Sequence, residues 1–363
     1  MNNRERKIQL RSTTKNNIIT LVLVAAAFVA VQILMATGNI KSLYAGLMVP
    51  ICYYVIMAVS LNLTVGILGE LSLGHAGFMC AGAYASSMFS VVFQESFSSG
   101  TLRFALAILI GGLIAALLGF LIGIPVLRLR GDYLAIVTLA FGEIIKNLVN
   151  NIYIAKDRSG WHFSMSADMK TALDPETREM LLDGAAGIRG TPRDASFAAG
   201  FILVMITLLV IMHLVDSRAG RAIKSIRDNR IAAESIGINI TKYKLIAFTV
   251  SAFFAGTAGA LYSHNISTLQ ANTKNFGYTM SILILVMVVL GGMGKLRGSV
   301  IAAVILTVLP EALRGLAEYR MIIYAVVIIA MMIINNNEKF KQLINKINLR
   351  KFFADKKAKK EVQ

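Results

Sequence analysis

Long apolar runs, separated by short polar segments, repeat along nearly the whole chain. A helix needs about 20 apolar residues to cross the hydrocarbon core of a bilayer. Backbone polar groups in lipid must be satisfied internally, so continuous runs of this kind favour helices over a barrel. Ten runs predict membrane-embedded helices, at 18–37, 45–66, 73–93, 104–127, 132–152, 195–215, 245–265, 278–294, 299–313 and 320–334.

The ten runs differ in how strongly they predict a crossing. The run at 73–93 is rich in small and polar residues. The two runs after Thr279 are closely spaced, which leaves room for one short or re-entrant segment. We therefore expect an all-α, polytopic membrane protein with about ten membrane-embedded helices.

The composition supports this class. Hydrophobic residues make up 56% of the chain and charged residues 16%, and the mean hydropathy is +0.65. These values lie outside the range of soluble globular proteins.

Basic residues predict the orientation, because Lys and Arg concentrate in cytoplasmic loops. With the N-terminus inside and all ten spans crossing, the inside segments hold 25 of the 37 basic residues. The predicted outside loop at 153–194 is near neutral, with six basic and seven acidic residues. We expect a cytoplasmic N-terminus at 1–17, a transmembrane domain at 18–335 and a cytoplasmic tail at 336–363. The net charge of +17 then reflects topology and attraction to anionic lipid, which argues against a nucleic-acid partner.

The outside loop is the largest predicted insertion. Its segment from Ser164 to Leu182 has helix-compatible spacing and could lie along the membrane surface or form a short helix pair. Tyr153 and Trp161 stand where aromatic belt residues are expected. The loop is either a solvated connector or a contact for an external partner.

Several kinds of chemistry are missing from the sequence. Gly294 and Lys295 are followed by Leu296, so no phosphate-binding loop is present. The four histidines are scattered singly, which predicts no metal site. Glu143 and Lys146 are ionisable residues within one span, three positions apart on one helix face. They form either a structural ion pair or part of a translocation path.

A glycine-rich segment, GILGELSLGHAGF, covers residues 66–78 and is followed by GAY. Small residues at helical spacing allow another helix to approach closely. A helix start broken by glycine also leaves free amides that favour anions such as a carboxylate. The segment is therefore either a tight packing surface or part of a solute path near the midplane or its cytoplasmic mouth. The path residues would be Ser72, Gly74, His75 and Gly77, with Glu143 as a further candidate.

A second glycine cluster interrupts the apolar region near residue 295. Glycines at this density bend or break a helix, and Lys295 with Arg297 would anchor the break at the cytoplasmic face. The sequence predicts a structural turn made by Gly291, Gly292, Gly294 and Gly298.

The segment at 216–244 is polar, basic and helix-forming, and it joins two apolar spans. Ala232, Ala233 and Ile236, with Ile231, would give a short helix a small apolar face, and Gly237 would end it. A short helix tied to spans on both sides can transmit motion when a partner clamps it. A solvated loop with inside charge is the alternative interpretation.

Together these three segments resemble the LivM-like permeases of branched-chain amino-acid ABC importers, over roughly residues 40–335. The resemblance rests on GELSLGHAGF with GAY, on GRAIKSIRDNRIAAESIGIN followed by KLIAFTVSAFFAGTAGALY, and on GGMGKLRG. In that family the cytoplasmic loop before the later spans sits in a groove of the ATPase subunit.

The resemblance implies which residues couple to the ATPase. The general permease pattern of this loop is E-A-A-x-x-x-G, and Ala232, Ala233 and Gly237 fit it. Ile231 replaces the glutamate, and the trailing proline of the pattern has no match. The coupling residues are thus expected to be Arg227, Ala232, Ala233, Glu234 and Gly237, without a particular ionic contact. The glycine turn also departs from the family, because Lys295 and Arg297 stand where smaller or uncharged residues are expected.

The resemblance further implies a transport subunit, not an enzyme, in the bacterial plasma (inner) membrane. Its partners would be a second homologous permease chain in a heterodimer, two ATP-binding cassette subunits and an external solute-binding protein. ATP and Mg²⁺ would bind the partner ATPases, and this chain would hold no cofactor or metal. The expected cargo is a branched-chain or related aliphatic amino acid.

Two other functions stay open. Related permeases import urea or short-chain amides, so the cargo could belong to that class. An ATP-independent channel or secondary carrier would explain the spans and the charge bias. It would leave the element from Ala232 to Gly237 unexplained.

Overall fold

The structure is a computed structural model that describes residues 20–34, 37, 45–97, 99–129, 131–157, 160–166, 179–313, 322, 325–326 and 329. The predicted termini at 1–17 and 336–363 lie outside the described residues, as does most of the predicted span at 320–334. Chain contacts divide the protein into Met1–Val308 and Leu309–Gln363. The arrangement below concerns the first unit.

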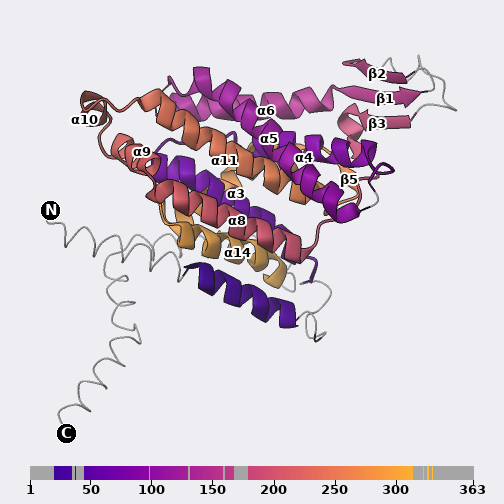
Figure 1. Ribbon diagram of the computed structural model, residues 1–363, viewed down its shortest axis with the longest axis horizontal. Coiled ribbons are helices and arrows are strands. Elements are labelled where there is room, and N and C mark those ends of the chain that lie inside the picture. The colour runs from indigo at the N-terminus through magenta and orange to yellow at the C-terminus, as the bar shows by residue number, and fades with distance from the viewer. Residues whose placement is uncertain are drawn as a thin grey trace, which may run out of the picture. The chain divides into compact units, whose positions relative to one another are not determined.

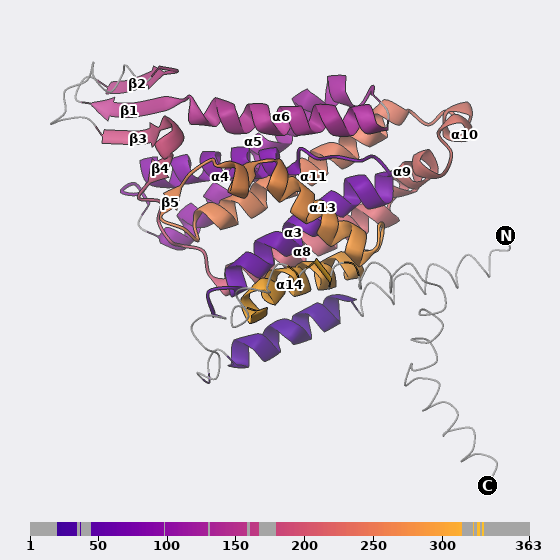
Figure 2. The same cartoon turned by 180° about the vertical axis from the view of Figure 1, so that it is seen from behind.

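Helices lie in each predicted span from the first to the one at 299–313 (Figures 1 and 2). They are Thr20–Leu34, α3 (Met48–Asn62) with the π-helical turn η1 (Leu63–Leu68), α4 (His75–Val92), α5 (Gly100–Val126), α6 (Asp132–Asn150), α8 (Phe197–Asp216), α11 (Ile240–Ser263), α13 (Tyr278–Gly291) and α14 (Leu296–Ala312). Three short helices join them: α9 (Arg218–Asp228), α10 (Arg230–Ser235) and α12 (Thr273–Phe276).

Among the described residues, five stretches are long and apolar enough to cross a membrane. They are Met48–Leu68, Gly100–Val126, Phe197–Asp216, Ile240–Ser263 and Thr273–Gly291. The protein is therefore a polytopic helical membrane protein. The count of ten crossings stays a prediction.

The core lies where α11 packs against α3, α4 and α5. Gly82 of α4 meets Gly256 of α11 so closely that a Cβ on Gly82 would lie 2.3 Å from the Cα of Gly256. Protein surrounds α4, so its small and polar residues avoid lipid, which explains the weak hydropathy of 73–93. By contrast, 28% of the most apolar stretch of α5 is buried inside the protein. The corresponding share for α3 with η1 is 89%.

The predicted outside loop contains strands, which corrects the all-α prediction outside the membrane helices. The strands β1 (Tyr153–Asp157), β2 (Gly160–Ser164) and β3 (Glu179–Asp183) form an antiparallel sheet in the order β2-β1-β3, and β4 (Ile188–Arg189) pairs with β5 (Thr268–Leu269). The helix predicted from Ser164 to Leu182 is wrong at both described ends, while residues 167–178 lie outside the described part. Just before this segment, Trp161 and Phe163 are both exposed, an alternation typical of a strand, and that strand continues to Ser164.

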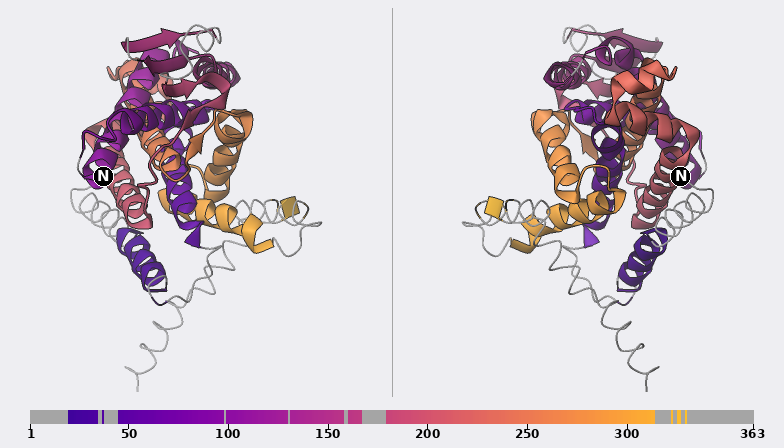
Figure 3. Two further views of the ribbon diagram at one scale, coloured as in Figure 1. Left: turned by 90° about the vertical axis from the view of Figure 1, so that its right-hand side faces the viewer. Right: turned by 90° about the vertical axis from the view of Figure 1, so that its left-hand side faces the viewer.

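The three-stranded sheet and the α9–α10 pair lie at opposite ends of the helices (Figure 1). In the two end views of Figure 3, the sheet faces the viewer in one and α9–α10 in the other. The sides of a membrane on which 153–194 and 216–244 lie stay a prediction.

We expect Gly256→Val to destabilise the core, because a Cβ there would lie 2.4 Å from the Cβ of Ala115. Overpacking of this kind costs about 1–3 kcal/mol. The midpoint of thermal unfolding in detergent should fall. Ala140→Val on the exposed side of α6 is the matched control, and an unchanged midpoint for Gly256→Val would contradict the packing.

Candidate functional site

The three sequence clusters meet in space at the end of the helices that carries α9 and α10. Asn62 and Gly66 come from the α3–η1 helix, Arg227 from α9, and Gly294 and Ser299 from the glycine turn and the start of α14. We call these five residues the junction. Hydrogen bonds join Asn62 to Gly294 and Ser299, and a further one joins Arg227 to Gly66, on the same helix as Asn62.

The α3–η1 helix ends in a widened turn. After Asn62 the backbone adopts π-helical bonding over η1, and the helix stops at Gly69, whose φ is +81°. π-helical turns are rare and occur frequently at functional sites. The widened turn places Gly66 against the glycine turn from the other half of the chain.

Asn62 holds the glycine turn with its side-chain amide. Its Oδ1 accepts a hydrogen bond from the Gly294 N–H at 2.8 Å, and its Nδ2 donates to the Ser299 hydroxyl at 2.8 Å. A Cβ on Gly66 would lie 1.7 Å from Asn62 Oδ1 and 2.2 Å from Gly294 N. Only glycine therefore allows this approach at position 66.

Arg227 connects the helix α9 to the same place. Its Nη1 donates a hydrogen bond of 2.6 Å to the carbonyl oxygen of Gly66. The side chain passes close to two further glycines, because a Cβ on Gly69 would lie 2.9 Å from Arg227 Cγ and one on Gly294 would lie 3.2 Å from Nη1. A hydrogen bond from a charged donor is among the stronger kinds in proteins.

The glycine turn itself is compact. A Cβ on Gly298 would lie 1.6 Å from the carbonyl oxygen of Gly291. Gly292 and Gly294 both have positive φ, at +89° and +80°. The chain thus reverses between α13 and α14 at the predicted glycines.

Side-chain caps separate the coupling segment into three helices. Ser217, Asn229 and Asn239 accept hydrogen bonds from the first turns of α9, α10 and α11. Such caps each stabilise a helix start by about 0.5–2 kcal/mol. Gly237, with φ of +84°, ends α10 in the left-handed conformation that glycine favours.

Both short helices pack on the membrane helices through apolar side chains. Ile223 of α9 contacts a cluster that includes Ile67 and Leu68 of η1. Ala233 of α10 is buried with Ile226 and Ile240. A displacement of α9 would therefore displace the side chains of η1 that it contacts.

The predicted single apolar face of α10 is wrong. Ala233 points into the protein, whereas Ile231 and Ile236 are 78% and 75% exposed, and Ala232 and Glu234 are exposed too. The apolar residues lie on two sides of α10. Ala233 packs against Ile226 of α9 and Ile240 of α11, which leaves the isoleucines on the side that faces away from the protein. The exposed pair remains uncovered in the isolated chain.

An ion pair lies beside the junction. Lys244 of α11 and Glu70, just after η1, form a salt bridge, and the Lys244 side chain is buried. A pocket of about 380 Å³ lies nearby, lined by residues that include Ile67, Lys224 and Gly294. The pocket lies between α9, η1 and the glycine turn.

The predicted path residues occupy packed positions. His75 is buried, and its Nε2 lies 2.9 Å from the Ser60 hydroxyl. Gly74 and Gly77 lie in close contact with α6. A Cβ on Gly74 would lie 2.1 Å from the Thr138 carbonyl oxygen, and one on Gly77 would lie 2.5 Å from the Gly142 Cα.

Ser72 differs from these residues, because its buried hydroxyl has no hydrogen-bond partner. Buried polar groups without a partner are rare in folded proteins.

Glu143 and Lys146 form the ion pair that their spacing suggested. Glu143 also accepts a hydrogen bond of 2.8 Å from the Tyr278 N–H at the start of α13, and Lys146 donates to the Thr273 hydroxyl at 3.2 Å. A carboxylate at a helix N-terminus is stabilising. The pair therefore ties α6 to α12 and α13.

Among the described residues, no three His, Cys, Asp or Glu side chains are grouped so that they could hold a metal ion. The junction region brings together polar side chains that include Arg227, Lys244, Glu70, Asn62 and Ser299.

Comparison with known proteins fits this arrangement. Residues 43–334 match the family described as branched-chain amino acid transport system / permease component. The chain belongs to this family. The matched range of this chain includes all three clusters, so the junction lies within it.

Individual relatives agree with the family. The chain is 37% identical over 292 residues to the high-affinity branched-chain amino acid transport system permease proteins LivM of Salmonella typhimurium and Escherichia coli. Each match covers 77% of this chain and 66% of the relative. The ribose import permease protein RbsC of Haemophilus influenzae is 30% identical over 158 residues, which is 39% of this chain and 49% of that relative. No solved structure matches.

Sequence reasoning missed two features of the junction region. Asn62 was not singled out, although a carboxamide inside a long apolar run is costly unless it is hydrogen-bonded. The pairing of Glu70 with Lys244 was also missed, because 174 positions separate them in the chain. The unusual polar residue was a usable signal, whereas the pairing required the fold.

We expect substitutions of Glu70 and Lys244 to have non-additive effects on stability, because the two side chains form one ion pair. Lys244→Gln should lower stability by up to about 3–5 kcal/mol, because it leaves a carboxylate without its partner in a mostly buried site. Adding Glu70→Gln should restore part of the loss. The unfolding midpoint in detergent measures both effects, and a double variant no better than Lys244→Gln would contradict the pairing.

Proposed function

We propose that this chain is a transmembrane subunit of an ABC importer and that α9 and α10 receive motion from a separate ATPase. The observation that carries this proposal is the pair of exposed isoleucines, Ile231 and Ile236, on a capped helix at the end of the membrane helices. Large apolar side chains exposed together at a polar end favour a protein contact.

The surroundings of the isoleucines favour a protein partner over lipid. The adjacent helix α9 exposes basic side chains around its buried apolar face, namely Arg218, Arg221, Lys224 and Arg227. Charged side chains around a small apolar centre are typical of a docking surface with a polar rim. The coupling residues proposed for this contact are Ala232, Glu234 and Gly237. Ala233 would hold α10 against Ile226 and Ile240, and Arg227 would link α9 to the Gly66 carbonyl.

The contacts suggest how motion would travel. A partner that pushes α10 would move α9, because Ala233 and Ile226 pack together. Arg227 would then pull or release the Gly66 carbonyl in η1, and Asn62 would carry the movement to the glycine turn. Since η1 is a widened turn, a shift of hydrogen bonds there needs no unfolding of α3. Such a shift could switch access to the path between the two sides.

The cargo follows from the family and its relatives. Because the family is a branched-chain amino acid transport permease family, branched-chain or related aliphatic amino acids are the proposed cargo. The proposed path would run beside Ser72, Gly74, His75 and Gly77. Glu143 of α6 would keep α13 in place beside the path through its hydrogen bond with the Tyr278 N–H. The unpartnered Ser72 hydroxyl supports this placement.

The remaining parts of the proposal concern assembly. A second homologous permease chain, two ATP-binding cassette subunits and an external solute-binding protein would complete the importer. ATP and Mg²⁺ would bind the ATPase subunits, which would carry out hydrolysis. The chain would lie in the inner membrane with both termini in the cytoplasm.

Ile236→Asp should abolish binding to the ATPase subunits, because it places a charge in the proposed contact. Met165→Asp is the matched control, since Met165 is also exposed but follows β2 at the opposite end. Co-purification of the ATPase with the solubilised permease measures the effect. Retention of the ATPase by Ile236→Asp would contradict the assigned docking surface.

Uptake by cells that carry the complete transporter should be selective for branched-chain amino acids. Unlabelled leucine, isoleucine or valine should compete with labelled leucine, and urea or acetamide should not. Uptake should also stop when the ATPase subunit carries a catalytic substitution. Uptake that continues without ATP hydrolysis would favour a channel or secondary carrier instead, and competition by urea would favour the amide-importer alternative.

A further inference from the structure

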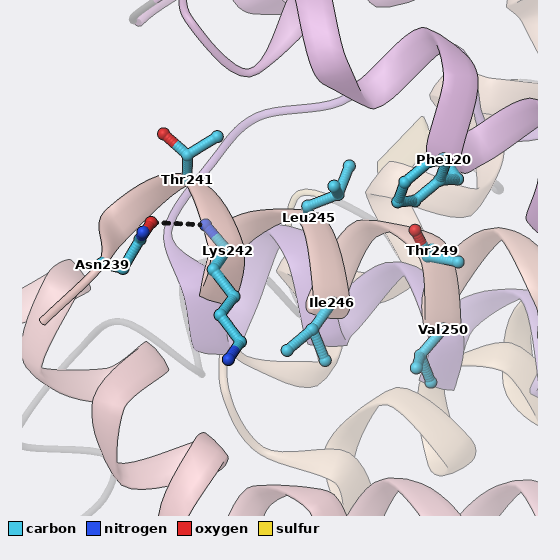
Figure 4. Close-up of a pocket in the computed structure, with 8 residues that line it drawn as sticks. All are labelled: Phe120, Asn239, Thr241, Lys242, Leu245, Ile246, Thr249 and Val250. Atoms are coloured by element: carbon cyan, nitrogen blue, oxygen red, sulfur yellow. Dashed lines mark hydrogen bonds between the residues drawn. The ribbon is translucent and has the colours of Figure 1, made fainter.

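A groove runs along the outer side of α11 where it passes α5 (Figure 4). Its volume is about 580 Å³. Seven of its residues come from the start of α11 and the residue that caps it, and one comes from α5. They are Phe120, Asn239, Thr241, Lys242, Leu245, Ile246, Thr249 and Val250.

The residues of α11 that line the groove form two adjacent rows along the helix. Thr241, Leu245 and Thr249 form one row along α11, and residues 242, 246 and 250 form the adjacent row, since positions four apart lie above one another. At 1.5 Å per residue, the rows extend over about 12 Å along the helix axis. Figure 4 shows both rows on the ribbon of α11, with Phe120 near the far end. This shape suits an extended hydrocarbon chain.

The two ends of the groove differ in polarity. Phe120, Leu245, Ile246 and Val250 make most of the length of the groove apolar, and the Thr249 hydroxyl lies among them. The polar residues Asn239, Thr241 and Lys242 gather where α11 begins. Asn239 already accepts a hydrogen bond from the Lys242 N–H at 3.0 Å, whereas the Lys242 ammonium group is exposed.

A second cation follows the neighbouring helix. Gly123 of α5 lies against α11, because a Cβ there would be 2.7 Å from Leu245 Cδ1. Arg128 comes five residues later, just after α5 ends, and is exposed. Lys242 and Arg128 thus give the same end of the groove positive charge, which complements an anion.

The surface around the groove suits lipid. α5 exposes Leu117, Phe120, Leu121 and Ile124 over the same stretch. A surface of this kind, continuous along a membrane helix, faces acyl chains when no protein covers it. Basic groups at the cytoplasmic ends of membrane helices bind anionic headgroups.

We propose that the groove along α11 binds an anionic phospholipid. One acyl chain would lie against Leu245, Ile246 and Val250, and the phosphate end would meet Lys242 and Arg128. The inference goes beyond the proposed transport function and does not depend on it. The site lies at the start of the same helix that carries Lys244, so a bound lipid would touch the helix that follows the coupling segment.

Titrations of the purified full chain with phosphatidylglycerol and phosphatidylcholine of identical acyl chains test the proposal. Native mass spectrometry gives the apparent Kd of each lipid. Phosphatidylglycerol should bind more tightly, and Lys242→Gln should weaken it about fivefold, the effect of one cation near an anionic headgroup. Lys274→Gln is the matched control, because Lys274 is exposed in α12 near the sheet end.

Three results would overturn the proposal. One is equal affinity for the two lipids in the unsubstituted chain, and a second is equal affinity of Lys242→Gln and Lys274→Gln for phosphatidylglycerol. The third concerns a protein occupant: if Ile246→Cys reacts with a maleimide in the isolated chain but is fully protected in the assembled transporter, the groove is an interface between chains. Reaction in both states, with the expected titration, supports a lipid site. Uptake is not measured here, so failure of the lipid site leaves the transport proposal intact.

Discussion

The close contact between Gly66 and Gly294 is the constraint on which the arrangement at this end of the protein depends. It leaves no room for a side chain at position 66, since a Cβ would overlap both Asn62 Oδ1 and the Gly294 amide. Because the turn is held there, α13 and α14 meet α3 at a fixed point. Arg227 can then reach the Gly66 carbonyl from α9. A short surface helix is thereby joined to the membrane core by a polar contact as well as by apolar packing.

The combination of apolar packing and hydrogen bonds determines how α9 and η1 can move together. Apolar contacts such as Ile223 with Ile67 are non-directional and tolerate sliding. Hydrogen bonds from Arg227 and Asn62 are directional, so they are either made or lost as the parts move. An element with such discrete arrangements can be biased by a partner at one side and by cargo at the other. The π-helical turn η1 is the described segment best placed to change in this way.

Sequence patterns predicted much of this structure. Apolar runs located the membrane helices because their burial in lipid or protein needs continuous hydrophobicity, and the second glycine cluster marked the turn at Gly294. Three things escaped. The strands at the two described ends of the segment from Ser164 to Leu182 were read as helix because short strands carry a weak signal. The orientation of Ala233 depended on packing against Ile226 and Ile240. The partners of Asn62 lie more than 230 positions away in the chain, and no local pattern encodes such a contact.

Hydrogen exchange of the η1 backbone in the assembled transporter tests the central claim most directly. Peptides that cover residues 63–69 would be compared with and without a non-hydrolysable ATP analogue, for the unsubstituted chain and for Arg227→Gln. If α9 drives η1 through Arg227, the nucleotide changes exchange in these peptides of the unsubstituted chain and has little effect in Arg227→Gln, while peptides of α10 respond in both. The same nucleotide response of residues 63–69 in both proteins would contradict the account.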